Sequence, residues 1–490
     1  MRRFMSLGSG IRVPRAVSSD RALAAKMLPA CFRRWMRKQV VALFLLSAAM
    51  LVALPGAAKD TSRATAAKVP PDRAFLKAKK EFQHQSRHKK AAERIAALKL
   101  LEDFPTGDAA DLVYVTLLDD RTDEVREAAV SFLAGLRDRS EVSDKLLQRM
   151  TSATRKDGLD IRAIGGLRAL SGTEDDALQI KIVKYLDDVL GTPQANQFLL
   201  HEMIDQESGR GDPKDTLRML MLFTRAQFFS RNFGYRRCLV QGVMQVKDKD
   251  GITHLINLLP NFKGLVQFDV ISHLVTATGQ NFGDDAAKWK AWWTQNQGQS
   301  DPPDKSRIPP VGNYGKFSEY YGIPICAKRV VFVLDTSGSM RGAKLDAAKT
   351  ELVRVIKELP KEVFFSMVIF NTAIRVWQSE LVPANEQMKQ IAVNIVLEQE
   401  ARANTASYDA LEAAFELGPE AIYFLSDGAP QGGKIDDPKE IISSISSANR
   451  VRRVSIHSIG IDTNATTGAI FGRFMKTLAE SNWGLYKPIN

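Results

Sequence analysis

The sequence predicts a multidomain chain in which an α-solenoid is followed by a doubly wound α/β domain. Two observations support this fold class. Between residues 83 and 297, apolar residues recur at helical spacing and similar pieces of sequence repeat. After residue 328, apolar strand-like runs alternate with helical stretches. A proline-rich stretch at 298–316 separates the two patterns and is expected to be a linker, so residues 317–490 are expected to fold alone.

Composition limits the classes of function. The chain has 490 residues, of which 44% are hydrophobic and 25% charged, which is typical of a soluble globular protein and not of a disordered or collagen-like one. The net charge of +12 is concentrated in residues 1–58, which hold ten Lys/Arg and one acidic residue. The remaining 58 Lys/Arg nearly balance 55 Asp/Glu, so we expect no nucleic-acid partner.

The N-terminal 58 residues have the pattern of an export signal. Four basic residues precede a fifteen-residue apolar run, Val40–Leu54, and Gly56, Ala57 and Ala58 supply small residues after it. As a helix the run would span about 22 Å, less than the roughly 30 Å hydrocarbon core of a bilayer. A cleaved signal peptide and an uncleaved membrane anchor are both open. Either one places the rest of the chain outside the cytoplasm, in the periplasm or beyond, with membrane contact only through this segment.

Residues 59–82 are rich in Lys, Ala and Pro, and we expect a mobile tether there. Cleavage after Ala58 would leave two cysteines, Cys238 and Cys326. In an oxidising compartment they either pair or remain buried free thiols, and both alternatives are open.

The region 83–297 is expected to be a stack of helix pairs. Arg94, Arg126 and Arg162 each lie in a similar helical piece and are 32 and 36 residues apart, a period typical of an α-solenoid. The units resemble HEAT repeats, in which such an arginine ties neighbouring turns together. The resemblance implies an extended surface that binds another protein. Trp289, Trp292 and Trp293 share one helical face, which indicates a hydrophobic cap closing the array rather than a sugar-binding platform.

The C-terminal part is expected to contain a mostly parallel sheet covered on both faces. Its first strand is a continuous apolar run, as in a buried central strand. The expected strands are Val330–Leu334, Val363–Phe370, Ile374–Gln378, Ala421–Ser426, Val454–Ile461 and Gly484–Lys487, and the expected helices are Lys344–Leu359, Glu386–Leu397, Tyr408–Glu416, Pro438–Ala448 and Gly472–Glu480.

Oxygen-bearing side chains follow two of these strands. In doubly wound sheets ligands bind beyond the carboxyl ends of the strands, so five residues are expected to converge there: Asp335, Ser337, Ser339, Thr405 and Asp427. All five offer oxygen, which a hard divalent cation prefers, and none offers sulfur or imidazole, as zinc or copper would favour. If these side chains, some acting through water, hold a six-coordinate Mg²⁺, one position stays exchangeable for a carboxylate of a partner.

The pattern in about 328–490 resembles the von Willebrand factor A domain. Asp335, Ser337 and Ser339 match the D-x-S-x-S sequence of that family's metal-ion-dependent adhesion site, and Thr405 and Asp427 match its second and third loops. The resemblance implies that the serines bind Mg²⁺ directly, that the aspartates act mainly through water, and that an acidic group of the ligand completes the site. Mn²⁺ is expected to replace Mg²⁺. The family often has glycines where this chain has Arg402-Ala403-Asn404.

Three other motifs are not interpreted as sites. The run 428–434 fits G-x-x-x-x-G-K, but Ile435 stands where a P-loop has Ser or Thr, so we interpret it as a turn. The tripeptide 210–212, Arg-Gly-Asp, is interpreted as a chance match. His84 and His88 are four residues apart, but Gln85 replaces the glutamate of a zinc-protease helix.

These inferences favour an exported, non-enzymatic binding or adhesion protein, resembling exported bacterial proteins with an A domain and helical repeats. Its magnesium site would engage a carboxylate of a protein partner, and the helical region would offer a second surface. Two alternatives are open: an accessory subunit that recruits substrate to an envelope enzyme, and a structural envelope protein whose metal stabilises the fold.

Overall fold

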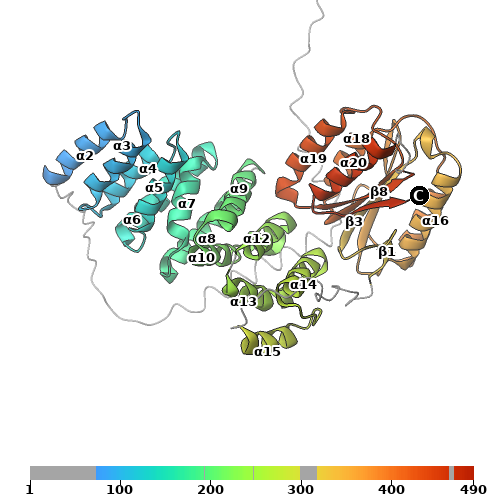
Figure 1. The fold of residues 1–490 in the computed structure, drawn as a ribbon, viewed down its shortest axis with the longest axis horizontal. Coiled ribbons are helices and arrows are strands. Elements are labelled where there is room, and N and C mark those ends of the chain that lie inside the picture. Colours follow the sequence, from blue (N-terminus) through green and yellow to red (C-terminus); the bar gives the residue numbers. More distant parts are fainter. Residues whose placement is uncertain (1–72, 192–193, 247, 298–316, 463–467, 490) are drawn as a thin grey trace, which may run out of the picture. The chain divides into compact units, whose positions relative to one another are not determined.

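The computed structural model describes residues 73–191, 194–246, 248–297, 317–462 and 468–489. The expected export segment (1–58) and linker (298–316) lie outside these ranges. Within them, a helical region is followed by an α/β domain with a mostly parallel central sheet, which confirms the predicted fold class (Figure 1). None of the helices in the described ranges is both long enough and apolar enough to cross a membrane.

The helical region consists of short helices joined by tight turns. Its helices are α2 (Arg73–Gln85), α3 (Ala91–Ala96), η2 (Ala97–Leu101), α4 (Gly107–Leu117), α5 (Asp123–Ala134), α6 (Ser140–Asp157), α7 (Ile161–Ser171), α8 (Asp176–Leu190), α9 (Gln194–Arg210), α10 (Pro213–Phe223), α11 (Gln227–Arg231), α12 (Phe233–Gln245), α13 (Lys249–Leu258), η3 (Leu259–Asn261), α14 (Gly264–Thr278) and α15 (Ala286–Asn296).

The first helix begins within the segment that we expected to be a tether. Helix α2 starts at Arg73, ten residues before the predicted boundary at 83. Its Phe75 and Phe82 are seven residues apart, lie on one helical face and are buried in the core of the helical region. Burial of these two rings therefore extends the helical region into 73–82, despite the lysines on the other faces.

The three arginines of the repeat pattern converge on one turn. Both carboxylate oxygens of Asp120 accept hydrogen bonds from Arg94, at 2.8 Å each, and Arg94 is almost fully buried. Arg126 donates to the backbone carbonyl of Asp120, and Arg162 pairs with Asp119. The turn between α4 and α5 is thus held from three successive helical units.

The Arg-Gly-Asp tripeptide is accounted for by the turn between α9 and α10. The Asp212 side chain caps α10 by accepting hydrogen bonds from the backbone amides of Lys214 and Asp215, both at 3.0 Å. Its carboxylate is therefore engaged within the chain.

The tryptophans close the described helical region as a cap. Trp289 is fully buried, donates from Nε1 to the carbonyl of Gly283 at 2.8 Å and packs edge-on against Phe282. Trp293 donates to the hydroxyl of Thr253 at 2.9 Å. Because these rings pack inward, the predicted cap fits the structure better than a sugar-binding platform.

The α/β domain contains a seven-stranded sheet with main order β5-β4-β3-β7-β8-β9; β6 pairs with β4 outside this path. Strands β3, β4, β7, β8 and β9 run parallel, whereas β5 and β6 run antiparallel to β4. The strands are β3 (Arg329–Asp335), β4 (Phe364–Phe370), β5 (Ile374–Val376), β6 (Val382–Pro383), β7 (Ala421–Ser426), β8 (Ser455–Ile461) and β9 (Tyr486–Ile489), with a separate hairpin of β1 (Glu319–Tyr320) and β2 (Ile323–Pro324).

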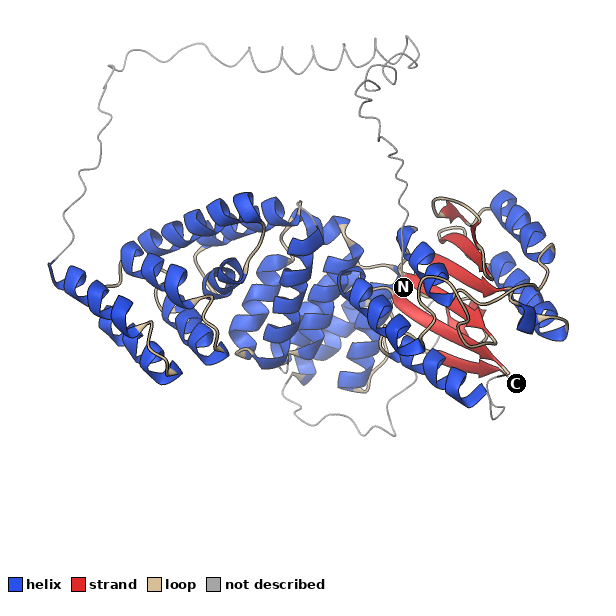
Figure 2. Ribbon diagram, turned by 90° about the horizontal axis from the view of Figure 1, so that it is seen from above, coloured by secondary structure: helices blue, strands red, loops and turns tan. Residues whose placement is uncertain are grey.

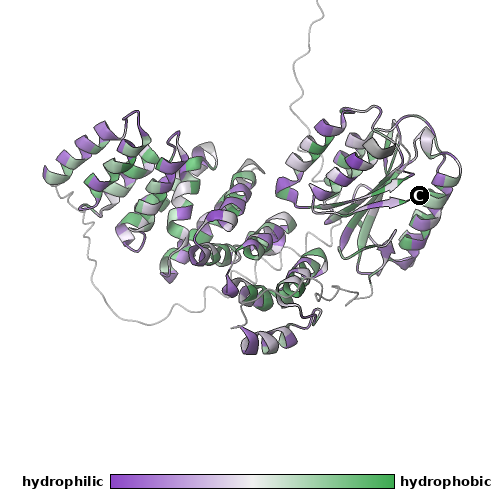
Figure 3. Cartoon of the chain, in the orientation of Figure 1, coloured by the Kyte–Doolittle hydropathy of each residue, from purple (hydrophilic) through white to green (hydrophobic). Residues whose placement is uncertain are grey.

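Helices cover both faces of this sheet, as Figure 2 shows. The helical elements are η5 (Gly338–Met340), α16 (Ala343–Glu358), α17 (Glu386–Leu397), α18 (Ser407–Glu416), α19 (Pro438–Arg452) and α20 (Gly468–Glu480). Side chains of β3 alternate between two apolar cores, with Val330, Phe332 and Leu334 facing α16 and α17, and Val331 and Val333 facing α18, α19 and α20. The strands are accordingly apolar along their length, whereas the helices carry polar outer faces (Figure 3).

Two buried arginines and their aspartate partners join the helical region to the α/β domain within one compact unit. We call Asp205, Arg237, Asp269 and Arg453 the joint. Arg453, at the C-cap of α19, donates to Asp205 at 2.6 Å and to Gln241 at 2.9 Å. Arg237 of α12 donates to Asp269 at 2.7 Å and to the carbonyl of Arg453 at 2.6 Å.

Apolar and backbone contacts support the joint. Leu265 of α14 belongs to the apolar core of the α/β domain. A Cβ at Gly234 in α12 would lie 2.0 Å from the carbonyl oxygen of Val451, so the two helices meet where only glycine fits. Cys238 and Cys326 are both buried free thiols, which agrees with the second of the two cysteine alternatives.

Candidate metal centre

Two neighbouring parallel strands end at the candidate site. Asp335 is the last residue of β3, and Asp427 directly follows β7, which pairs with β3. Because parallel strands end at the same edge of a sheet, both aspartates lie there. The loop after α17 reaches the same edge, where the carbonyl of Ala403 accepts a hydrogen bond from the amide of Gly338 at 2.9 Å.

Asp335 is fully buried and held from two sides. One carboxylate oxygen accepts the backbone amide of Ser337 at 2.7 Å, and the other accepts the hydroxyl of Ser426. Burial raises the pKa of Asp335 to about 6, and the negative charge of Asp427 adds to the rise. A positive charge in the site would offset both the cost of burying the Asp335 carboxylate and its repulsion from Asp427.

Ser337 and Ser339 connect the two aspartates through the backbone amide of Ser337 and the hydroxyls of both serines. The Oγ atoms of Ser337 and Ser339 are 3.1 Å apart, and Ser339 donates to Asp427 at 2.7 Å. The D-x-S-x-S segment therefore wraps around the end of β3 so that its side chains point toward the end of β7. Asp335, Ser337, Ser339 and Asp427, four of the five predicted site residues, are therefore connected by hydrogen bonds.

Thr405 is the fifth predicted residue and is also buried at this edge. A Cβ at Gly428 would lie 3.2 Å from Ser339 Oγ and 3.9 Å from Thr405 Oγ1, so both hydroxyls face the space that the missing side chain leaves. The loop before Thr405 has Ala403 in the left-handed region at φ 65°, a conformation that suits glycine better than alanine.

The structure adds a charged residue to the candidate site that the sequence analysis missed. Lys344, in the first turn of α16, places its ammonium group 2.8 Å from the second carboxylate oxygen of Asp427 and 3.2 Å from Asp462. The only signal in the sequence was the position of this lysine in the first turn of an expected helix, where the helix dipole disfavours a cation.

The residues present fit a hard divalent cation. They supply two carboxylates and three hydroxyls at one edge of the sheet, with the hydroxyls of Ser339 and Thr405 closest to Gly428, and all these groups offer oxygen. In the described ranges, no group of three or more His, Cys, Asp or Glu side chains could hold a metal ion, so a cation at this edge would depend on the hydroxyl oxygens beside the two carboxylates.

The family comparison matches this part of the chain. Residues 328–487 form a von Willebrand factor type A domain. Domains of this family generally mediate protein–protein interaction. Similar solved structures include a von Willebrand factor type A protein from Catenulispora acidiphila. It is 23% identical, the match covers 33% of this chain and 38% of that chain, and the TM-score is 0.29. For the PilB minor pilin from Streptococcus sanguinis, the identity is 17%, the match covers 33% of this chain and 56% of that chain, and the TM-score is 0.26.

Curated relatives include the inter-alpha-trypsin inhibitor heavy chains. Heavy chain H3 of Bos taurus is 26% identical over 191 residues, covering 36% of this chain and 21% of that protein. Heavy chain H4 of Homo sapiens is 28% identical over 192 residues, covering 36% and 20%. The chain thus spans about a fifth of the length of these relatives.

The structure gives the P-loop-like run a different role. The run 428–434 follows β7 as a turn, and Gly432 and Gly433 have positive φ. At its end, the Lys434 amide donates to Asp409 at 2.9 Å and the Lys434 side chain pairs with Glu412. The turn is held against α18, as the sequence interpretation expected.

Proposed function

We propose that this protein is a magnesium-dependent binding protein whose A domain engages an acidic group of a protein partner. The observation that carries the proposal is the chain of hydroxyls between two carboxylates at the ends of β3 and β7. Asp335, Ser337, Ser339, Thr405 and Asp427 would hold the cation, and Mn²⁺ would substitute for Mg²⁺ because it accepts the same donors.

The residue types suit reversible recognition. Serine and threonine hydroxyls are neutral and therefore weak donors, so they leave a cation electron-poor. A bound divalent cation would supply a charge-assisted contact to an incoming carboxylate. The aspartates hold the hydroxyls in place: Asp335 fixes the turn at Ser337, and Asp427 orients Ser339.

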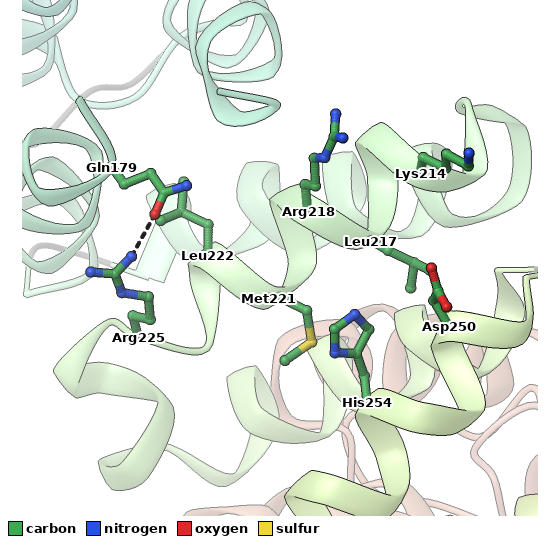
Figure 4. Close-up of a pocket in the computed structure, with 9 residues that line it drawn as sticks. All are labelled: Gln179, Lys214, Leu217, Arg218, Met221, Leu222, Arg225, Asp250 and His254. Carbon is green, nitrogen blue, oxygen red and sulfur yellow. Dashed lines mark hydrogen bonds between the residues drawn. The ribbon is translucent and has the colours of Figure 1, made fainter. Parts of the chain in front are cut away.

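The helical region offers a second candidate surface. A hollow of about 500 Å³ lies among α8, α10 and α13 (Figure 4). Leu217 and Met221 supply apolar surface, and the charged side chains that line the hollow are those of Lys214, Arg218, Arg225 and Asp250, three of them positive. We propose that this hollow contacts a partner protein, in keeping with the HEAT-like repeat interpretation.

The proposal includes export and a non-enzymatic role. The basic and apolar pattern of residues 1–58 supports export, followed by release or retention at the membrane. Sequencing the N-terminus of protein from the native host tests the cleaved form, which would begin near Lys59. An accessory subunit of an envelope enzyme is the alternative, and copurification of an enzymatic activity with the chain would favour it.

Metal-dependent capture tests the binding proposal. The immobilised chain is incubated with envelope extract in Mg²⁺ or in chelator, alongside Asp335→Ala. We expect a partner that is retained only in Mg²⁺ and lost in the variant. Retention that is equal in chelator and in the variant would refute the metal-dependent function.

A further inference from the structure

A lysine ammonium already occupies one side of the candidate metal centre. The Asp427 side chain is fully buried, and its two oxygens are taken by Ser339 at 2.7 Å and by Lys344 at 2.8 Å. The Lys344 side chain is 33% exposed and also reaches Asp462, which is 59% exposed, at 3.2 Å. The ammonium group therefore bridges a buried and an exposed carboxylate.

We propose that Lys344 is a built-in counter-ion that stabilises the metal-free site and lowers its affinity for a divalent cation. The inference rests on the proposed function, because it concerns the same site. Asp335 and Asp427 are two buried carboxylates at one edge, and an unneutralised buried charge destabilises a fold. Lys344 supplies the compensating charge when no cation is bound.

The position of Lys344 argues against an incidental surface pair. It lies in the first turn of α16, where the helix dipole disfavours a cation. Its partner Asp427 is inaccessible to solvent, unlike the partners of an ordinary surface ion pair, so the interaction is screened less by water and salt. Asp462 gives the ammonium group a second partner at the exposed rim.

The ammonium group of Lys344, which stabilises the metal-free site, also weakens the binding of a cation there. A divalent ion held by Asp427 would meet the ammonium of Lys344 on that carboxylate, and like charges at such range repel substantially even in a polar environment. Because Lys344 is partly exposed, screening reduces the effect. We expect removal of its charge to raise the affinity for Mg²⁺ about tenfold, within the range of a partly screened charge pair.

The test compares two charge-removing variants on the same helix. Lys344→Met keeps the length of the side chain and removes its charge. Lys349→Met is the matched control, because the Lys349 ammonium donates to the carbonyl of Leu397 at 3.1 Å and not to a site carboxylate. Mg²⁺ is titrated calorimetrically into the full chain of wild type, Lys344→Met, Lys344→Arg and Lys349→Met, and thermal melts are recorded with and without Mg²⁺.

We expect Lys344→Met to destabilise the metal-free protein and to favour the Mg²⁺-bound protein. Lys344→Met should bind Mg²⁺ about tenfold more tightly and melt at a lower temperature without metal, with the deficit closing at saturating Mg²⁺. Lys344→Arg and Lys349→Met should resemble wild type. Equal or weaker binding by Lys344→Met, with binding retained by wild type, overturns the counter-ion inference and leaves the proposed function intact. Absence of binding in every variant overturns both.

Discussion

Arg453→Met tests whether the joint makes the helical region and the A domain one cooperative unit. Sequence patterns predicted that residues 317–490 fold alone, but the joint argues against independent folding. Arg453 is 4% exposed and its guanidinium binds Asp205 and Gln241 of the helical region. Methionine keeps an apolar side chain beside Trp483, but it removes the charge over that ring and the hydrogen bonds to Asp205, Gln241, Cys238 Sγ and the carbonyl of Arg450.

The size of the effect follows from these contacts. Hydrogen bonds that involve a charged group contribute about 1.5–3 kcal/mol each. Asp205 is 34% exposed and regains water when Arg453 is replaced, which offsets part of the loss. We therefore expect a loss of about 2–4 kcal/mol, concentrated in the coupling between the helical region and the A domain.

Differential scanning calorimetry of the full chain shows whether the helical region and the A domain melt as one cooperative unit or independently. Wild type should melt in one main transition, and Arg453→Met should show two. The neighbouring Arg452→Met is a matched control, because Arg452 pairs only weakly with the exposed Glu416 within the A domain, at 3.3 Å. Equal calorimetric profiles for Arg452→Met and Arg453→Met would refute the assignment of the joint.

Three further predictions concern packing, pH and the metal site. Gly234→Ala should lower the free energy of unfolding by several kcal/mol, because the added Cβ would clash with the backbone carbonyl of Val451. Gly209→Ala, whose Cβ would meet nothing within 4 Å, should be neutral or slightly stabilising, and urea denaturation of both variants measures the difference. Burial lowers the pKa of His201 and His457 to about 3, so the unfolded chain binds more protons than the folded chain as the pH falls through 6.5. The free energy of unfolding should therefore fall by about 2 kcal/mol per histidine between pH 6.5 and 4.5, and a flat pH profile of unfolding would contradict this. Thr405→Ala should weaken Mg²⁺ binding only a few-fold in a calorimetric titration, because water replaces a neutral ligand; complete loss would contradict that role.

Local patterns were sufficient for most of the A domain. Apolar runs placed β3, β4, β7 and β8 within one or two residues of their bounds, and the polar residues after β3 and β7 marked the site edge. The sequence pattern missed β1, β2 and β6, because two-residue strands carry no periodic signal. It placed the start of α20 four residues late and the end of α19 four residues early.

Contacts between distant segments could not be predicted in this way. Arg453 meets Asp205 across 248 residues of sequence and Gln241 across 212, and neither lies in a motif. The pairing of Lys344 with Asp427 depends on where α16 starts relative to the end of β7, which follows from packing of the helix on the sheet. Such contacts are set by tertiary structure, whereas the five candidate oxygen ligands could be proposed from the sequence because each lies at the end of a strand or just before a helix.

A calorimetric titration of Mg²⁺ into wild type and Asp335→Ala tests the central claim most directly. Asp335 is buried at the end of β3 and carries a pKa raised by burial and by Asp427, so alanine removes a ligand carboxylate while leaving the apolar strand unchanged. We expect one Mg²⁺ per wild-type chain and no detectable binding by Asp335→Ala. The metal-free melting temperature should change only slightly, because relief of the repulsion with Asp427 offsets the loss of the hydrogen bonds from Ser337 and Ser426. Equal Mg²⁺ binding by the two proteins would show that this edge of the sheet is not a metal centre.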